Sequence, residues 1–275
     1  MIIGHQKQIT FLKKILNSGK IPHALLFSGP EKIGKKKVAF EFASWILGEN
    51  IFSHPDFLFI EPKENSIQID QIRDLIWKIE LKPFVAKKKI AILDKAHLMT
   101  KEAQNCFLKT LEEPPKDSII ILVSSFPALL LSTIISRCQK IRFFPPKRDE
   151  IEKFLKEKGI SKKEREKILK ICRGKVGLVF DILEKGKLKE IEEMEKNLEK
   201  FEKMRLFEKF EFLKQLKEEK IFLEFLISRL ENEIFVPDKR KKTLSLLKFL
   251  QLVFSQNLIS KVDKKMAFEI LLAQF

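Results

Sequence analysis

Short apolar segments alternate with helix-like segments along the first 145 residues, and this alternation constrains the fold more than any other feature. Segments typical of strands lie at 24–28, 57–60, 89–93, 119–123 and 140–143. The central ones are uninterrupted apolar runs such as "IIILV", as expected for strands buried on both faces of a parallel sheet. Helical periodicity precedes and separates them at 5–18, 35–47, 68–79 and 101–112. We therefore expect a doubly wound α/β domain.

The pattern changes at "FFPPKRDE", and no strand-like segment follows it. Capping residues predict two short helices, one over 150–158 behind Asp149 and one over 162–172 behind the capping box of Ser161 and Glu164. A third is expected at about 177–186, after the glycines of "CRGKVG". These three helices predict a small helical lid domain.

The remainder of the chain is predicted to be entirely helical. A charged segment runs to about 203, and helices rich in Phe and Leu are expected over 205–218, 220–233, 239–255 and 260–274. This spacing is typical of a helix–helix core. The predicted organisation is an α/β domain over 1–146, a lid over 147–186 and an all-α collar over 187–275.

Composition limits the partners and the compartment. The net charge of +16 favours contact with polyanions, but charge alone does not choose among nucleic acid, acidic proteins and membrane surfaces. The three cysteines are far apart, which argues against a disulfide framework and a local zinc knuckle. Because we find no signal peptide and no apolar run of about 18 residues, we expect a cytoplasmic protein without membrane contact.

The stretch "LLFSGPEKIGKKKVAF" carries an altered phosphate-binding loop. The P-loop pattern G-x-x-x-x-G-K-[ST] is matched by Gly29, Gly34 and Lys35, between a predicted strand and a predicted helix. Lys36 stands where the pattern requires the hydroxyl that binds magnesium. An ammonium group at that place repels a metal ion.

A second alteration lies at the end of the third predicted strand, in "KKIAILDKAH". Asp94 is well placed as the second metal-linked residue. The next position, where ATPases of this type usually carry a glutamate that activates water, is Lys95, and a charged lysine cannot accept a proton from water. Gly29, Gly34, Lys35 and Asp94 therefore form a degenerate nucleotide site. Two interpretations stay open: the loop binds ATP or ADP weakly without turnover, or it is a vacant structural turn.

Several ordered motifs carry a family resemblance. They include "IPHALLFSGPEKIGKKK", "HPDFLFIEP", "IQIDQIRDL", "KKIAILDKAHLMTKEAQNCFLKTLEEPPKDSIIILVSS" and "TIISRCQKIRFF", which together span nearly all of 1–146. In these motifs the chain resembles the clamp-loader AAA+ family, most closely the delta-prime subunits of bacterial DNA polymerase III. The last 89 residues resemble that family only in length and helicity.

The resemblance implies a role for Arg137. In the family, the arginine of the "SRC" motif is an arginine finger that reaches the ATP site of a neighbouring subunit, where it stabilises transition-state charge. Here it lies in "LSTIISRCQ", which we expect to be a loop between two strands. The alternative is an arginine paired with a carboxylate at a sheet edge. Ser125 occupies the sensor-1 position, and Leu178 replaces the sensor-2 arginine.

By the same resemblance, the chain is a non-hydrolysing stator of the clamp loader, which uses ATP to place a sliding clamp on primed DNA during replication. The implied partners are ATPase subunits, a delta-like subunit, the clamp through the complex, and primer–template DNA, in a cytoplasmic, nucleoid-associated replisome. No cofactor is required. Many relatives carry a four-cysteine zinc module after the P-loop helix, but here that segment offers only His54, so we expect no zinc.

Two rival functions belong to other classes. An ATP-hydrolysing loader or motor subunit would need a metal ligand and a base that are missing from their usual positions. A stand-alone basic nucleic-acid-binding protein would exploit the net charge, but the chain shows no base-reading motif. Contact with DNA through phosphates, as part of a ring, remains compatible with the composition.

Overall fold

A five-stranded parallel sheet forms the centre of the first 142 residues in the computed structural model, which describes residues 2–186 and a few isolated positions between 193 and 208. The strand order is β2-β3-β4-β1-β5, and every pair is parallel. The strands are β1 (Ala24–Ser28), β2 (Phe57–Ile60), β3 (Lys89–Leu93), β4 (Ser118–Ser124) and β5 (Gln139–Arg142). The predicted α/β class is confirmed.

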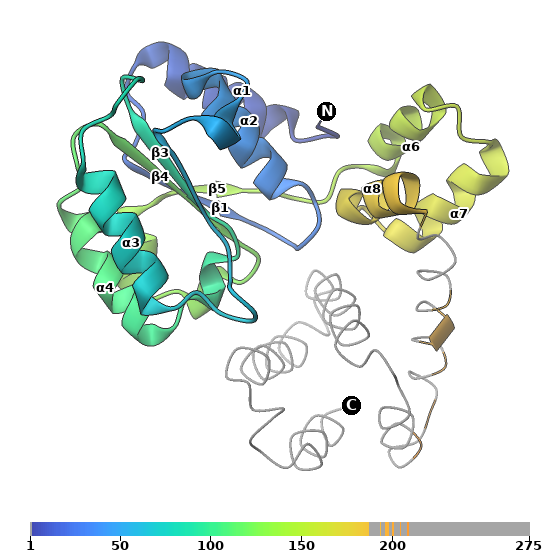
Figure 1. The fold of residues 1–275 in the computed structure, drawn as a ribbon. Helices are drawn as coiled ribbons and strands as arrows, with labels where there is room; N and C mark the ends of the chain where they lie inside the picture. The colour runs from blue at the N-terminus through green and yellow to red at the C-terminus, as the bar shows by residue number, and fades with distance from the viewer. Residues whose placement is uncertain are drawn as a thin grey trace. The chain divides into compact units, whose positions relative to one another are not determined.

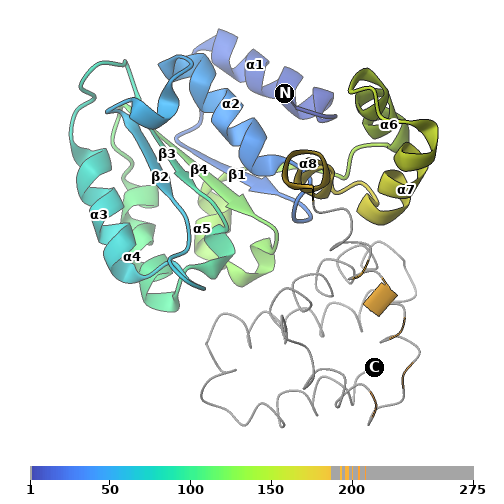
Figure 2. The same cartoon turned by 45° about the vertical axis from the view of Figure 1, so that its right-hand side comes forward.

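Helices cover both faces of this sheet (Figures 1 and 2). On one face lie α1 (Gln6–Ser18) and α2 (Lys35–Leu47), and on the other lie α3 (Ile69–Glu80), α4 (Lys101–Glu112) and α5 (Ser132–Arg137). The central strands β3 and β4 are buried along their whole length, as their uninterrupted apolar sequences require. Three short 3-10 helices, Ile51–Ser53, Ala96–Leu98 and Pro127–Leu129, complete the connections.

Helix α5 is a correction to the sequence prediction. The segment expected to be a loop forms a helix of 6 residues that ends at Arg137. Gln104 of α4 accepts a hydrogen bond from the Leu131 amide at 2.8 Å, just before the helix begins, and Ile134 is fully buried against the same core as α4. A helix this short shows no periodicity in a sequence, so tertiary packing decides its conformation.

The three helices predicted after the sheet are present as α6 (Arg148–Glu157), α7 (Lys162–Cys172) and α8 (Val176–Lys185). Ser161 caps α7 as predicted. Asp149 does not cap α6, because the helix begins two residues earlier than predicted, with Lys147 at the cap position. Glu150 completes that cap by accepting a hydrogen bond from the Lys147 amide at 2.8 Å.

The domain boundaries stay a prediction. The chain divides into two compact units, Met1–Gly177 and Leu178–Phe275. Apart from the single position Glu208, the four helices predicted within 205–274 lie outside the described residues. Within the described part, no helix is both long and apolar enough to cross a membrane. The same residues contain no group of three or more His, Cys, Asp or Glu side chains arranged to hold a metal ion. The expectation that zinc is absent is still a prediction.

Candidate functional site: the altered phosphate loop and Arg137

The loop between β1 and α2 has the path of a P-loop, and its two glycines are required there. Gly29 has a φ of 151°, and a Cβ atom on it would lie 2.3 Å from the carbonyl oxygen of Phe143. Gly34 has a φ of 107° and occupies the cap position of α2. Side chains other than hydrogen are strained in such conformations. Both predicted glycine positions are therefore part of this turn.

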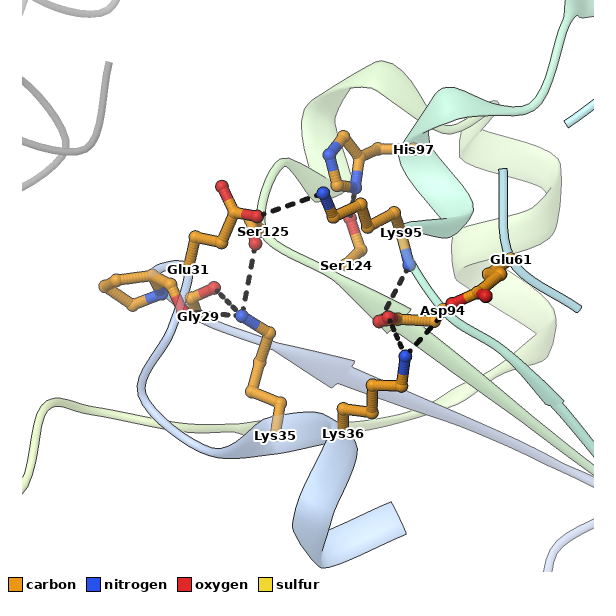
Figure 3. Close-up of polar contacts among 11 residues, drawn as sticks. Gly29, Glu31, Lys35, Lys36, Glu61, Asp94, Lys95, His97, Ser124 and Ser125 are labelled. Atoms are coloured by element: carbon orange, nitrogen blue, oxygen red, sulfur yellow. Dashed lines mark hydrogen bonds and ion pairs between the residues drawn. The ribbon is translucent and has the colours of Figure 1, made fainter. Parts of the chain in front are cut away.

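Lys35 is buried and contacts the loop itself (Figure 3). Its ammonium donates hydrogen bonds to the carbonyl oxygens of Gly29 at 2.6 Å and Pro30 at 2.5 Å. It also donates to Ser125 Oγ, just after β4, at 3.2 Å. The predicted sensor-1 residue is thus brought to the predicted phosphate-binding lysine.

Lys36 bridges the ends of two neighbouring strands. Its Nζ lies 3.1 Å from Asp94 Oδ2, directly after β3, and 3.2 Å from Glu61 Oε2, directly after β2. Glu61 was not among the predicted site residues. A signal for it existed, because residues that follow adjacent parallel strands meet at one edge of the sheet.

Lys95 faces Glu31, an acidic residue within the phosphate loop. Its Nζ lies 3.4 Å from Glu31 Oε1. Burial tends to raise the pKa of Glu31, but nearby positive charge, chiefly that of Lys95 with help from Lys35 and Lys32, outweighs burial and lowers that pKa below its usual value. Glu31 is therefore ionised at neutral pH.

His97 lies behind this pair, where it is buried and within 3.4 Å of Ser124 Oγ through its Nδ1. Burial, helped by the charges of Lys35 and Lys95 and opposed by Glu31, lowers the pKa of His97 to about 3. The imidazole is consequently neutral at physiological pH. Neither Glu31 nor His97 was predicted as a site residue, and no motif in the sequence indicates them.

These residues do not fit a magnesium ion. Magnesium in P-loop enzymes binds the hydroxyl at the position of Lys36 and an acidic group such as Asp94. Here an ammonium lies directly on the Asp94 carboxylate. At the position of the base that activates water, the ammonium of Lys95 is paired with Glu31. Both features agree with the alterations read from the sequence.

Arg137 is the last residue of α5 and lies outside this cluster. One guanidinium nitrogen donates to Glu112 Oε1 at 2.7 Å, and another donates to the Thr133 carbonyl at 2.9 Å. The side chain is 33% exposed. In this chain Arg137 is thus paired with a carboxylate, as the alternative to the arginine-finger role expects. Part of its side chain nevertheless stays accessible to solvent.

The predicted sensor-2 segment also reaches the loop. Gly177, the residue before Leu178, donates its amide hydrogen to the Lys32 carbonyl at 2.6 Å. A Cβ atom on Gly177 would lie 3.0 Å from the Lys32 side chain, so glycine suits this close approach. Leu178 itself is buried in α8.

Comparison with known proteins identifies relatives that match about half of this chain. The delta' subunit of DNA polymerase III from Pseudomonas aeruginosa is 34% identical over 135 residues, which is 42% of this chain and 41% of that protein. The delta' subunit from Bacillus subtilis is 32% identical over 181 residues, 57% of this chain and 54% of that protein. The tau subunit from Bacillus subtilis is 33% identical over 52% of this chain and 28% of its own length. The matched part thus spans about half the length of the two delta' subunits and little more than a quarter of the tau subunit.

The fold comparison extends further along the chain. A DNA polymerase III gamma subunit-related protein from Thermotoga maritima superposes with a TM-score of 0.52 at 22% identity, covering 97% of each chain. At this identity the likeness concerns the fold alone, and with the P-loop after β1 it agrees with the AAA+ class expected from the sequence. The family described as "DNA polymerase III, delta subunit" matches residues 4–147. Since that match covers more than half of the chain and includes both the altered phosphate loop and Arg137, the chain belongs to the DNA polymerase III delta-subunit family.

Proposed function

We propose that this chain is a non-hydrolysing, delta-prime-like subunit of a DNA polymerase III clamp loader, which donates Arg137 to the ATP site of a neighbouring subunit. Family membership and two relatives named delta' subunits support the assignment to DNA polymerase III. The finer role rests on the positions of individual side chains.

The placement of Arg137 carries this proposal. The guanidinium lies at the end of a short helix, is one-third exposed, and is held on one side by Glu112. A guanidinium presented in this way can approach a phosphate that a partner supplies, and two parallel hydrogen bonds to phosphate oxygens would replace those to the carboxylate. Beside a transferred phosphoryl group, such an arginine stabilises the developing charge.

The absence of hydrolysis by the chain itself is supported by Lys36 and Lys95. Each places a positive charge where ATP hydrolysis by a P-loop protein needs a metal ligand or a base. In this proposal the chain needs no cofactor of its own, and any ATP or ADP bound to its loop is not turned over. An ATP-hydrolysing subunit, the alternative, would have to act without the metal-binding hydroxyl and without the base that activates water.

The remaining partners follow from this role. The chain would assemble with ATPase subunits and a delta-like subunit into a hetero-oligomer that loads a sliding clamp onto primer–template DNA. The net charge of +16 suits contact with DNA phosphates within such an assembly. The complex would act in the cytoplasm, at the replisome.

The test is ATP turnover by the reconstituted loader in the presence of clamp and primed DNA. Arg137→Ala should lower turnover by about 100-fold or more, because it removes a transition-state contact, and Arg137→Lys should restore little. Arg73→Ala, which removes an exposed arginine on α3, is the matched control. Size-exclusion chromatography must show the same assembly for all variants.

Unchanged turnover with Arg137→Ala would refute the role in trans and leave Arg137 a structural residue. ATP hydrolysis by the purified chain would instead favour the hydrolysing subunit. Tight, salt-dependent binding of DNA by the isolated chain would favour the nucleic-acid-binding alternative.

A further inference from the structure

The ammonium of Lys36 has the surroundings of a bound cation. Carboxylate oxygens of Asp94 and Glu61 lie 3.1 and 3.2 Å from it. The ring centroids of Phe59 and Phe40 lie 4.6 and 5.7 Å away, within the range of cation–π attraction. Two anionic groups and two aromatic faces thus surround one positive charge (Figure 3 shows the carboxylates).

This arrangement joins three separate elements. Lys36 lies in the first turn of α2, Glu61 follows β2, and Asp94 follows β3. Asp94 is the more enclosed acid, with 14% of its side chain exposed against 60% for Glu61. Solvent screens an exposed pair strongly, so the contact with Asp94 contributes more than the contact with Glu61.

We propose that Lys36 is a covalently attached substitute for the divalent cation of a P-loop. Its ammonium neutralises Asp94 and Glu61 and ties the start of α2 to the ends of β2 and β3. The end of the phosphate loop that leads into α2 is thereby anchored by the chain's own side chains. This inference concerns the isolated chain and stands or falls independently of any role of Arg137 in a neighbouring subunit.

Two consequences follow for metal binding. A divalent cation cannot share the Asp94 carboxylate with an ammonium 3.1 Å away, because like charges at that distance repel strongly. If Lys36 is replaced by serine, the site instead offers a hydroxyl and two carboxylates, which are oxygen ligands suited to Mg²⁺ or Mn²⁺. The wild-type chain should then bind no Mn²⁺ at this place, and the serine variant should bind it.

The experiment is a titration of the full chain with Mn²⁺, followed by the loss of the free-ion signal in electron paramagnetic resonance. Four proteins are compared: wild type, Lys36→Ser, Lys36→Ser with Asp94→Asn, and Lys14→Met. The last removes the same charge from an exposed position on α1. We expect Lys36→Ser to bind Mn²⁺ at least about tenfold more tightly than the wild type, given the size of the repulsion removed. The other two variants should behave like the wild type.

The proposal is overturned if Lys36→Ser binds Mn²⁺ no more tightly than the wild type does, or if its gain in affinity persists when Asp94→Asn is added. Should the serine variant fail to fold, a double-mutant cycle with Lys36→Gln and Asp94→Asn decides the matter through the midpoint of urea unfolding. Strong non-additivity supports the tie between the two residues, and additive effects refute it.

Discussion

The guanidinium of Arg137 lies 2.7 Å from the carboxylate of Glu112, and these are the last residues of helices α5 and α4. Neither side chain is buried: the exposed fractions are 33% for Arg137 and 48% for Glu112. Water and salt weaken such a pair. The ion pair therefore orients the arginine but is weak enough to be exchanged for another anionic partner.

The first prediction concerns this pair. Glu112→Gln should lower the free energy of unfolding by less than about 1 kcal/mol, the upper range for an exposed ion pair. Urea denaturation followed by circular dichroism measures the difference, with the adjacent exposed Glu113→Gln as control. A loss several times larger would mean that Arg137 is a structural anchor and is not available to a partner.

The second prediction concerns Asp56, which is fully buried and fixes the loop after α3. Its carboxylate accepts hydrogen bonds from the amides of Phe84, Val85 and Ala86 at 2.6 to 2.8 Å. Asn has one acceptor oxygen, so Asp56→Asn should cost about 2 kcal/mol or more. Urea denaturation at pH 7 tests this, and an unchanged midpoint would show that the loop does not depend on the carboxylate.

Asp56 also makes the free energy of unfolding depend on pH in the acid range. Burial would raise its pKa, but the three amide hydrogen bonds outweigh burial and lower it below 3.8. A lowered folded-state pKa means that this contribution is fully present above about pH 4 and is lost as the pH falls through the folded-state value. Asp56→Asn should remove that part of the acid sensitivity.

The third prediction concerns His97 and a milder acid range. Because burial lowers its folded-state pKa from 6.5 to about 3, the unfolded chain binds the proton more readily between these values. Stability is therefore fully present above about pH 6.5 and declines towards pH 3, by up to about 1.4 kcal/mol per pH unit.

His97→Gln should flatten the decline between pH 6 and pH 4, as measured by urea midpoints across that range. Some slope should persist, because burial lowers the pKa of His5 as well. Equal slopes for wild type and variant would show that His97 is accessible to protons in the folded state.

The fourth prediction separates the strain of a backbone conformation from a steric clash. Gly29→Ala places a Cβ atom 2.3 Å from the Phe143 carbonyl, whereas Gly48, with a φ of 98°, has no atom within 4 Å of such a Cβ. Gly48→Ala should cost about 1 kcal/mol. Gly29→Ala should cost several kcal/mol more, because backbone atoms must move. Similar thermal midpoints for the two variants would contradict the close contact with Phe143.

The sheet could be predicted because burial on both faces imposes a distinctive composition. Strand β3 and helix α2 begin and end where the apolar runs and glycines indicated, and β4 extends one residue beyond its predicted range at each end. Helix α5 could not be predicted, since its conformation depends on the packing of Ile134 and on a hydrogen bond from Leu131 to Gln104, distant in sequence.

The site could be predicted in part. The motif indicated Gly29, Gly34, Lys35 and Asp94, and the structure brings them to one loop and one strand end. It did not indicate which acids the extra lysines contact. The contact of Lys36 with Glu61 follows from the neighbouring strands β2 and β3, so it emerges only when the strand order is known. The contact of Lys95 with Glu31 depends on the path of the phosphate loop.

If the chain is non-hydrolysing, as proposed, the lysine contacts also make ATP hydrolysis hard to gain by single substitutions. Changing Lys36 back to a hydroxyl residue leaves Asp94 and Glu61 facing each other without the ammonium between them. Changing Lys95 to an acid sets a new carboxylate against Glu31. Each single substitution thus removes a positive charge from neighbouring acids. A chain that carries both lysines would need more than one substitution to supply both the metal ligand and the base that hydrolysis requires.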